Sequence, residues 1–215
     1  LPKASFNIPI ENKIMGRGAF IVLEGCDKAG KSTQVKMLVE ALNKMKYPTE
    51  ARQFPDRNTV NGLLINQYLT SKVDLPSETV HSLFSINRWE GRDNILKTLR
   101  SGKTIVQNFI HKFDPIEQSL DWCKKEDKGL PAPDLVILLQ VDKETQARRC
   151  GWGEERFENT NFQQRVAENF LKLADETWKI IDNDEIKDTH SKVLEAAIDT
   201  IEAARDTPIK TLYES

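Results

Sequence analysis

The chain has 215 residues, of which 39% are hydrophobic and 30% are charged, and its formal net charge is −2. This length suits one domain with one sizeable core. The near-neutral charge argues against a nucleic-acid-binding surface, which would make the domain basic. No stretch approaches the roughly 18 consecutive apolar residues of a membrane-spanning helix. Three scattered cysteines suit a reducing compartment rather than a disulfide scaffold. We therefore expect neither nucleic acid nor membrane as a partner.

The first fourteen residues are polar and irregular, and they precede Met15. If Met15 is an original start site, residues 1–14 are an extension, either the remains of an organelle-targeting segment or an added sequence. We divide the chain into an N-terminal extension over residues 1–16 and a single domain over residues 17–215. The expected location is cytoplasmic, with a mitochondrial one as the alternative.

Apolar strand patterns alternate with helical patterns from residue 19 onward, which is typical of βαβ units and a parallel sheet. Strands are predicted at residues 19–24, 50–53, 104–107, 135–140 and 179–181. Helices are predicted at residues 31–46, 59–69, 77–100, 142–149, 162–178 and 191–204. The sequence thus predicts an α/β fold with a five-stranded parallel sheet and helices on both faces.

Two connections stand out among the predicted loops. Residues 124–133 combine glycine and prolines with charges and are predicted to form a solvated loop. Residues 150–158 carry glycines and charges between two predicted helices. Loops of this second kind can close over a reaction, so we expect a short lid there.

The most specific motif directly follows the first predicted strand. It fits the pattern G-x-x-x-x-G-K-[ST] and comprises Gly25, Cys26, Asp27, Lys28, Ala29, Gly30, Lys31 and Ser32. Glycines at both ends let the backbone wrap closely around a polyphosphate, so that N–H groups and the start of the next helix point at negative charge. Lys31 is expected to reach the β- and γ-phosphates and Ser32 to hold Mg²⁺, with Thr33 beside it. The motif predicts binding of a nucleoside triphosphate.

Cys26 lies within this loop and close to a helix N-terminus, a position that would lower the pKa of its thiol. A small side chain that simply fills the loop is the alternative interpretation, and we prefer it.

A second group of residues follows the second predicted strand. Residues 54–57 read Phe-Pro-Asp-Arg and fall at the carboxyl edge of the sheet, where ligands bind in doubly wound folds. Arg57 is suited to grip a phosphate there through two hydrogen bonds. A solvated surface cation is the alternative for a single arginine.

A third group lies on the long predicted helix. Val80, Phe84, Asn87 and Arg88 share one face through their i, i+3 and i+4 spacing. Phe84 alone would more often be a core residue. Phe84 together with Arg88 suits a base stacked above a bound phosphate. Three arginines surround the predicted lid: Arg148, Arg149 and Arg156. Each alone would be read as a solvated charge, but phosphoryl transfer needs mobile cations over the migrating group, which these residues would supply.

Taken in order, these segments resemble the thymidylate kinase family in its eukaryotic form, whose members transfer the γ-phosphoryl group of ATP to dTMP. The similarity runs from residue 17 to about residue 183. It includes RGAFIVLEG at 17–25, FPDR at 54–57, LFSINRWE at 83–90, SLDWC at 119–123, GLPAPDL at 129–135 and ERFEN at 155–159.

The resemblance implies a P-loop nucleoside-monophosphate-kinase fold, ATP and Mg²⁺ as cofactors, and a homodimer. On the acceptor side, Asp27 would contact the deoxyribose 3′-hydroxyl, Phe84 would stack on thymine and Arg88 would contact the base. Arg57 would hold the dTMP phosphate, and Phe54 belongs to the same substrate-binding set.

On the donor side, the resemblance makes Lys28 the additional loop cation of the eukaryotic form. Arg149 and Arg156 would belong to the ATP side and the lid. The residues that we expect to carry catalysis are Asp27, Lys28, Lys31 and Arg57.

The resemblance fails at one place. The family carries an Asp-Arg-Tyr motif after the third strand, where the aspartate acts near the metal and the arginine helps to hold the acceptor phosphate. Here Asn108 and Phe109 occupy those two positions, and the segment before Ser119 is several residues shorter. A splice form or faulty assembly that lacks a segment would explain this, and so would substitution by residues such as Lys112 or Asp114. We expect a dTMP kinase, with a catalytically degenerate ATP-binding subunit in a structural or interaction role as the alternative.

Overall fold

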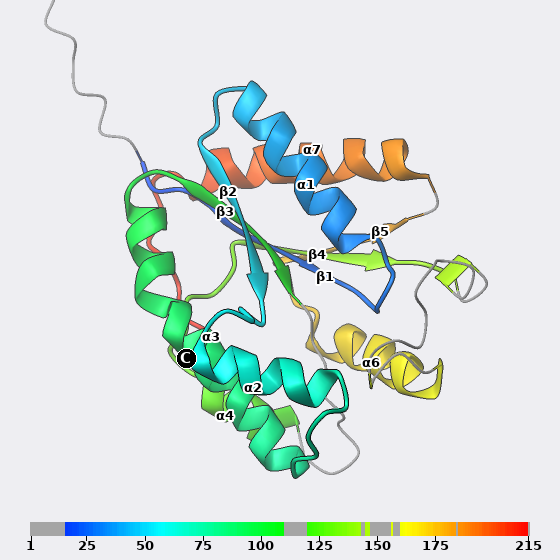
Figure 1. The fold of residues 1–215 in the computed structure, drawn as a ribbon. Coiled ribbons are helices and arrows are strands. Elements are labelled where there is room, and N and C mark those ends of the chain that lie inside the picture. Colours follow the sequence, from blue (N-terminus) through cyan, green and yellow to red (C-terminus); the bar gives the residue numbers. More distant parts are fainter. Residues whose placement is uncertain are drawn as a thin grey trace, which may run out of the picture.

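A parallel β-sheet forms the centre of the molecule (Figure 1). The computed structural model describes residues 16–109, 120–142, 145–146, 156, 160–183 and 185–214. Within these residues the five strands lie in the order β2-β3-β1-β4-β5, and every neighbouring pair is parallel. The strands are β1 (Phe20–Glu24), β2 (Thr49–Phe54), β3 (Thr104–Phe109), β4 (Leu135–Gln140) and β5 (Trp178–Asp182). The five predicted strands and their parallel arrangement are confirmed.

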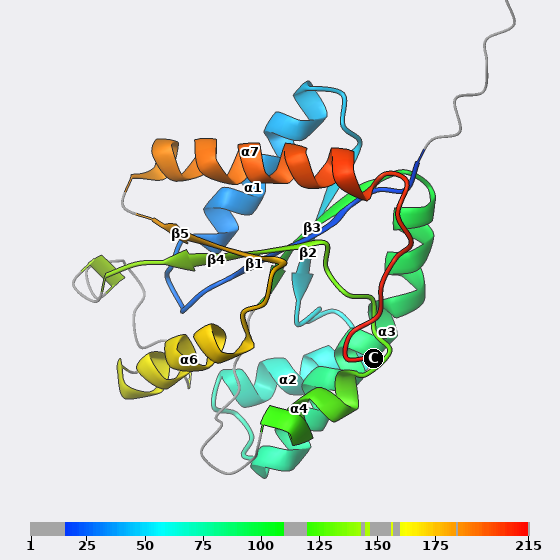
Figure 2. The same ribbon diagram turned by 180° about the vertical axis from the view of Figure 1, so that it is seen from behind.

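Helices cover both faces of this sheet, as predicted (Figures 1 and 2). On one face lie α1 (Lys31–Lys44) and α7 (Ile186–Ala204). On the other side lie α2 (Val60–Leu69), α3 (Ser77–Arg100), α4 (Leu120–Asp127) and α6 (Thr160–Leu173). None of the described helices has the length and hydropathy needed to cross a membrane.

The apolar run of β1 is buried from both sides. Ile21 and Leu23 pack into a cluster with α1 and α7, whereas Phe20 and Val22 pack against Ile95 and other residues of α3 and β3. Burial on both faces explains why the strand is continuously hydrophobic rather than alternating. Truncating one of its fully buried side chains to alanine should cost about 2–5 kcal/mol of stability.

Two predicted helix boundaries differ from those in the structure. The helix predicted for residues 162–178 ends at Leu173, and Trp178 instead begins β5. Asp175 turns the chain there: its carbonyl accepts from the Trp178 N–H at 3.0 Å, and its carboxylate accepts from the Thr177 N–H at 2.8 Å. The last helix begins at Ile186 rather than at residue 191. Its N-cap residue, Glu185, makes no side-chain capping bond, so no capping signal marks the helix start in the sequence.

The loop predicted for residues 124–133 is wrong in its first part. Residues up to Asp127 belong to α4, and the connection to β4 follows only after them. Of the helix predicted for residues 142–149, the described residues 145–146 are helical. Asp142 is described and lies before the helical residues, whereas residues 143–144 and 147–149, most of the predicted lid and residues 1–15 lie outside the described residues.

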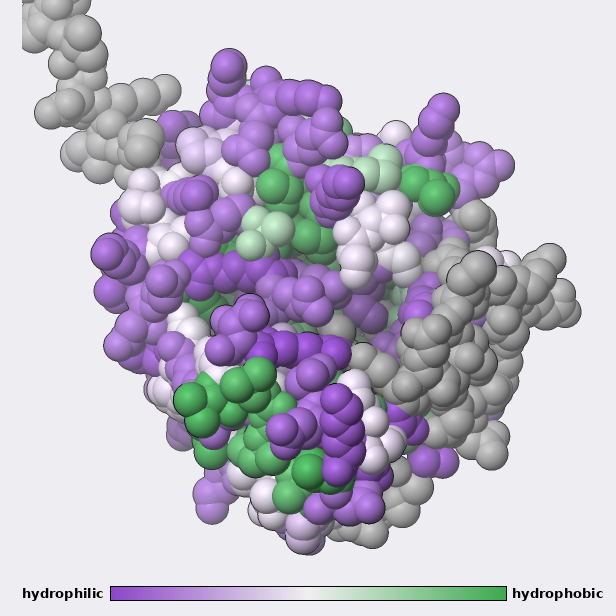
Figure 3. Space-filling model, in the orientation of Figure 1, coloured by the Kyte–Doolittle hydropathy of each residue, from purple (hydrophilic) through white to green (hydrophobic). Residues whose placement is uncertain are grey.

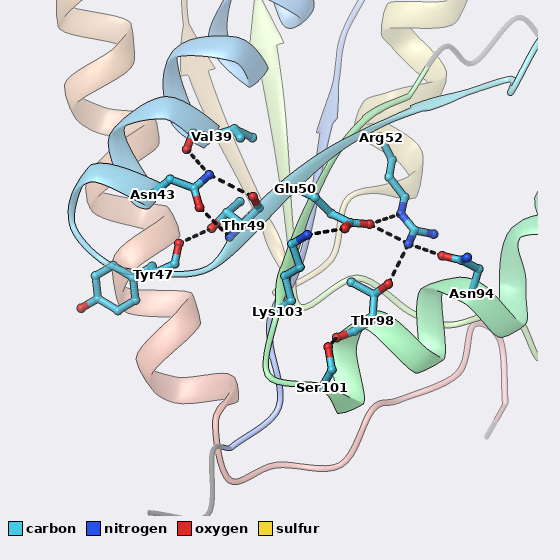
Figure 4. A network of polar contacts seen from close by, with 10 residues as sticks. All are labelled: Val39, Asn43, Tyr47, Thr49, Glu50, Arg52, Asn94, Thr98, Ser101 and Lys103. Atoms are coloured by element: carbon cyan, nitrogen blue, oxygen red, sulfur yellow. Dashed lines mark hydrogen bonds and ion pairs between the residues drawn. The ribbon is translucent and has the colours of Figure 1, made fainter.

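A charged network covers β2, the strand at one edge of the sheet (Figure 4). Glu50 accepts hydrogen bonds from Arg52 at 2.7 Å and from Lys103 at 2.8 Å, and Arg52 also donates to Thr98 of α3 at 2.9 Å. Although partial burial raises the pKa of Glu50, the hydrogen bonds from Lys103 and Arg52 lower it by more, so the net shift is downward. Charges on an edge strand discourage pairing with other chains. The network also fastens β2 to α3, and Phe54 is the last residue of this strand.

Candidate functional site

A phosphate-binding loop, residues 25–32, connects β1 to α1 at the carboxyl edge of the sheet. Gly25 has φ 143°, and a Cβ at this residue would lie 2.5 Å from the carbonyl oxygen of Leu139. Gly30 has φ 93° and immediately precedes α1. Both positions therefore require glycine, one for close approach to β4 and both for their backbone conformation. Both ends of the motif thus have the backbone freedom for which its glycines were singled out.

The loop leads into the N-terminus of α1, whose first residue is Lys31. Lys31 is buried, and its Nζ donates to the carbonyl oxygens of Gly25 at 2.6 Å and Cys26 at 3.0 Å. Ser32 and Thr33 are exposed in the first turn of α1, which contains no acidic side chain. Free N–H groups and the helix dipole favour an anion at such a terminus. The geometry suits a polyphosphate.

Asp27 is held in place by two buried glutamines. Gln163 of α6 accepts from the Asp27 N–H at 2.8 Å and donates to the Asp27 carboxylate at 3.0 Å. Gln146 donates to the Asp27 carbonyl at 2.7 Å. Sequence reasoning missed both glutamines. The available signal was that Gln163 adjoins Phe162, at the start of an apolar helix face, where a buried amide requires a partner.

Cys26 is not an activated thiol. Burial raises its pKa to about 11 and outweighs the attraction of Lys31 for the thiolate. Its Sγ lies 3.4 Å from the carbonyl oxygen of Gln163, to which it donates. The lowered pKa inferred from the helix N-terminus is wrong because desolvation of the thiolate dominates. Cys26 is a small residue that fills the loop.

The segment after β2 is fixed by helices on two sides. Asn87 of α3 is buried; its Oδ1 accepts from the Asp56 N–H at 2.8 Å and its Nδ2 donates to the Asp56 carbonyl at 3.2 Å. Gly62 of α2 lies so close that a Cβ would meet the Asp56 carbonyl oxygen at 1.8 Å. Arg57 is half-buried and donates to Asn66 at 2.9 Å. The structure thus places Arg57 at the carboxyl edge of the sheet on a well-anchored backbone.

Phe54 and Phe84 are largely packed in the interior. Phe54 is 6% exposed and packs with Ile95 and Leu99, and Phe84 is 8% exposed in a cluster with Tyr68 and other residues of α2 and α3. A ligand would reach only the rim of either ring. The substrate contacts expected of these two residues stay predictions.

Arg88 makes a buried ion pair that the sequence did not reveal. Its Nε donates to Asp127 at 3.1 Å, and a terminal nitrogen lies 2.6 Å from the other carboxylate oxygen. The guanidinium carbon lies 5.6 Å from the centre of the Phe109 ring, which in turn lies 6.5 Å from the Phe54 ring. Asp127 was missed because it fell in a predicted loop.

Asn108 contacts the residue predicted to hold the metal. It is buried at the end of β3, beside Leu23 of β1, and its Nδ2 donates to Ser32 Oγ at 2.9 Å. Its Oδ1 is buried and accepts no hydrogen bond from the part of the chain that the structure describes. Mg²⁺ takes oxygen ligands and usually keeps several of its own waters. The residues present therefore fit a magnesium ion.

Arg156 lies against α2. It donates to the carbonyl oxygens of Tyr68 and Val73, each at 3.1 Å, and pairs with Asp74 at 2.6 Å. Its guanidinium carbon lies 4.4 Å from the centre of the Tyr68 ring. Among the described residues, these partners belong to α2 and the following loop rather than to the phosphate loop. Arg148 and Arg149 lie outside the described residues.

A family model described as thymidylate kinase matches residues 23–193. The chain belongs to the thymidylate kinase family. It is 41% identical to the human thymidylate kinase over 209 residues, which cover 92% of the chain and 98% of that protein. It is 38% identical to the thymidylate kinase of Arabidopsis thaliana over 218 residues, covering 98% of the chain and 83% of the relative. The resemblance inferred from the ordered motifs is confirmed.

The fold is also that of a solved thymidylate kinase. The structure of the Candida albicans thymidylate kinase aligns with a TM-score of 0.81 at 33% identity, covering 92% of this chain and 99% of that one. The P-loop nucleoside-monophosphate-kinase fold is therefore confirmed. In this thymidylate kinase family member, the donor loop and the Asp56–Arg57 segment lie at the same edge of the sheet, because they follow parallel strands.

Proposed function

We propose that this thymidylate kinase family member transfers the γ-phosphoryl group of ATP to dTMP and forms dTDP. One observation carries the proposal: a complete phosphate loop and an anchored arginine, Arg57, lie at the carboxyl edge of one parallel sheet. In-line transfer requires two phosphates held together with their charges neutralised. Cations placed at a common sheet edge meet this requirement.

The donor half rests on α1 and the loop before it. N–H groups at the start of α1 would bind the ATP phosphates, and Lys31 would leave the loop carbonyls to reach the β- and γ-oxygens. Lys28 would add a second loop cation. Ser32, with Asn108 beside it, would hold Mg²⁺, which supplies charge neutralisation on the phosphate oxygens. Arg149 and Arg156 are proposed for the ATP side and the lid.

The acceptor half would use residues from three elements. Arg57 would bind the dTMP phosphate, and Asp27 would accept a hydrogen bond from the deoxyribose 3′-hydroxyl. Gln163 supports this role because it holds the Asp27 carboxylate before substrate arrives, while Gln146 holds the Asp27 backbone carbonyl. Arg88 would contact the base. The accessible rim of Phe84 would stack against the base, and Phe54 would belong to the same substrate-binding set.

We also propose a homodimer. Support comes from exposed apolar side chains on α2 and α3, namely Val60, Leu63, Ile86 and Trp89. Figure 3 shows apolar surface gathered over the region where α2 runs in Figure 1. Monomeric proteins rarely expose large apolar patches without a partner. Sedimentation equilibrium of the full chain should give twice the chain mass, and Leu63→Glu should reduce it. A cytoplasmic location, with a mitochondrial alternative, completes the proposal.

The test is product formation from ATP, Mg²⁺ and a panel of nucleoside monophosphates, resolved by chromatography. We expect dTDP from dTMP, and we expect Lys31→Ala to lower kcat by roughly 10³-fold or more because its cation stabilises the transferring group. Lys36→Ala is the matched control, since Lys36 is exposed on the same helix. ATP binding without any dTDP would contradict the proposal and favour the degenerate subunit.

A further inference from the structure

The ion pair between Arg88 and Asp127 is almost completely removed from solvent. The two side chains are 12% and 13% exposed, and they meet through two hydrogen-bonded contacts, at 3.1 and 2.6 Å. A guanidinium and a carboxylate joined in this way are fixed in one plane. Asp127 uses the Nε–H and one terminal N–H of Arg88, which leaves three of the five donors for other partners.

Further contacts hold the carboxylate and the guanidinium. Ser85, one turn before Arg88 on α3, is buried and donates to the same Asp127 oxygen at 2.7 Å. On the β3 side, Phe109 lies 5.6 Å from the guanidinium carbon. Arg88 is therefore held by a carboxylate from α4 and by an aromatic ring from the end of β3. Such a guanidinium is rigid, and its charge is compensated.

The backbone after Asp127 is fixed by the end of the chain. The Gly129 N–H donates to the carbonyl oxygen of Leu212 at 3.0 Å, and the Leu212 N–H donates to the carbonyl oxygen of Leu130 at 2.7 Å. Figure 2 shows this C-terminal segment running beside α3 to the end of α4. Asp127 thus sits between a helix packed on α3 and a turn clamped by the C-terminal segment. Its carboxylate has a defined position before any ligand arrives.

We propose that Asp127 is a positioning residue that presents Arg88 as a charge-compensated hydrogen-bond donor in the acceptor site. The inference rests on the proposed function, because it requires that the acceptor binds beside Arg88. A compensated guanidinium suits a neutral carbonyl, such as that of a nucleobase, and gives little attraction to a phosphate dianion. Arg88 would then select its ligand by the orientation of its hydrogen-bond donors rather than by its net charge.

The test compares two ligands that differ only in the phosphate. Calorimetric titration of the full-length protein with dTMP and, by displacement, with thymidine gives both values of Kd. Asp127→Asn keeps the shape of the side chain but removes its charge. We expect Kd to rise about tenfold for both ligands by the same factor, while Kd for ATP stays within twofold. Asp121→Asn is the matched control, an exposed aspartate in the first turn of the same helix.

A double-mutant cycle separates positioning from general structure. In an Arg88→Met background, Asp127→Asn should change Kd for dTMP by less than twofold. Ser85→Ala is the milder second variant if Asp127→Asn folds poorly, and it should raise both Kd values two- to threefold. An equal loss of affinity for ATP and for dTMP would overturn the proposal, because it would indicate a general structural effect of the substitution. Tighter dTMP binding with unchanged thymidine binding would overturn it in favour of a phosphate-binding Arg88.

The outcomes also distinguish this inference from the proposed function. Wild-type protein that binds dTMP but forms no dTDP would contradict the kinase proposal, and the equal loss for both ligands would still support a positioning Asp127. Wild-type protein that binds neither dTMP nor thymidine would overturn both.

Discussion

Replacing Gly62 by alanine should damage the acceptor site more than the fold. The added Cβ would lie 1.8 Å from the Asp56 carbonyl oxygen, which is 1.6 Å short of an ordinary contact at 3.4 Å. The obstacle is backbone rather than a flexible side chain, so α2 or the Asp56–Arg57 segment must move by roughly that distance. A misplacement of about 1 Å can cost about 10²-fold in rate. We therefore expect kcat/KM for dTMP to fall about 100-fold.

The effect on stability should be smaller. Overpacking costs about 1–3 kcal/mol, whereas alanine is about 1 kcal/mol better than glycine within a helix. The free energy of unfolding should thus fall by about 0–2 kcal/mol. Urea denaturation and steady-state kinetics measure the two quantities, and Gln67→Ala, at an exposed position of α2, is the control. Wild-type kcat/KM for Gly62→Ala would refute the reasoning, since it would mean that the position of Arg57 does not matter.

Asn108→Asp should lower the Mg²⁺ concentration for half-maximal activity about tenfold, because a carboxylate beside Ser32 attracts the ion and its waters more strongly than an amide; an unchanged Mg²⁺ titration would argue against a metal role for this position. Glu50→Gln should lower the free energy of unfolding by about 0.5–1 kcal/mol at pH 7. Since the folded pKa of Glu50 is lowered, this stability is present above its unfolded pKa of about 4.3 and is lost as the pH falls through the folded pKa. An equal deficit at pH 7 and at pH 3 would contradict the ion-pair explanation. Cys26, with a pKa of about 11, should resist iodoacetamide at pH 8 in the native protein and react in urea; peptide mapping that finds native Cys26 alkylated would show that the thiol is not protected.

Much of the fold follows from local sequence pattern. The predicted limits of α3, residues 77–100, and of β4, residues 135–140, agree with the structure because one is long and periodic and the other is a continuous apolar run. Helix α4 was not predicted, and the end of α6 and the start of α7 were misplaced, although the end of α7 at Ala204 was predicted correctly. Contacts with distant segments decide them, such as the Ser85 hydroxyl bonded to Asp127 of α4. The local sequence pattern does not indicate such contacts.

The same distinction applies to the site. The phosphate loop is contiguous, so its residues and its backbone conformation could be predicted from the motif alone. The residues that hold the site in place could not. Gln163 lies 136 positions from Asp27, and Asp127 lies 39 positions from Arg88. Each looks like an ordinary polar residue on a helix until the fold brings it to its partner.

We expect that the intact donor loop still supports turnover although Asn108 and Phe109 replace the expected Asp-Arg pair. The most direct measurement is the conversion of dTMP to dTDP by purified wild-type protein with ATP and Mg²⁺, followed by phosphorus NMR beside Lys31→Ala. The wild type should form dTDP in equal amount to ADP, and Lys31→Ala should form it more slowly by roughly 10³-fold or more. Saturable ATP binding with no dTDP from the wild type would contradict this expectation.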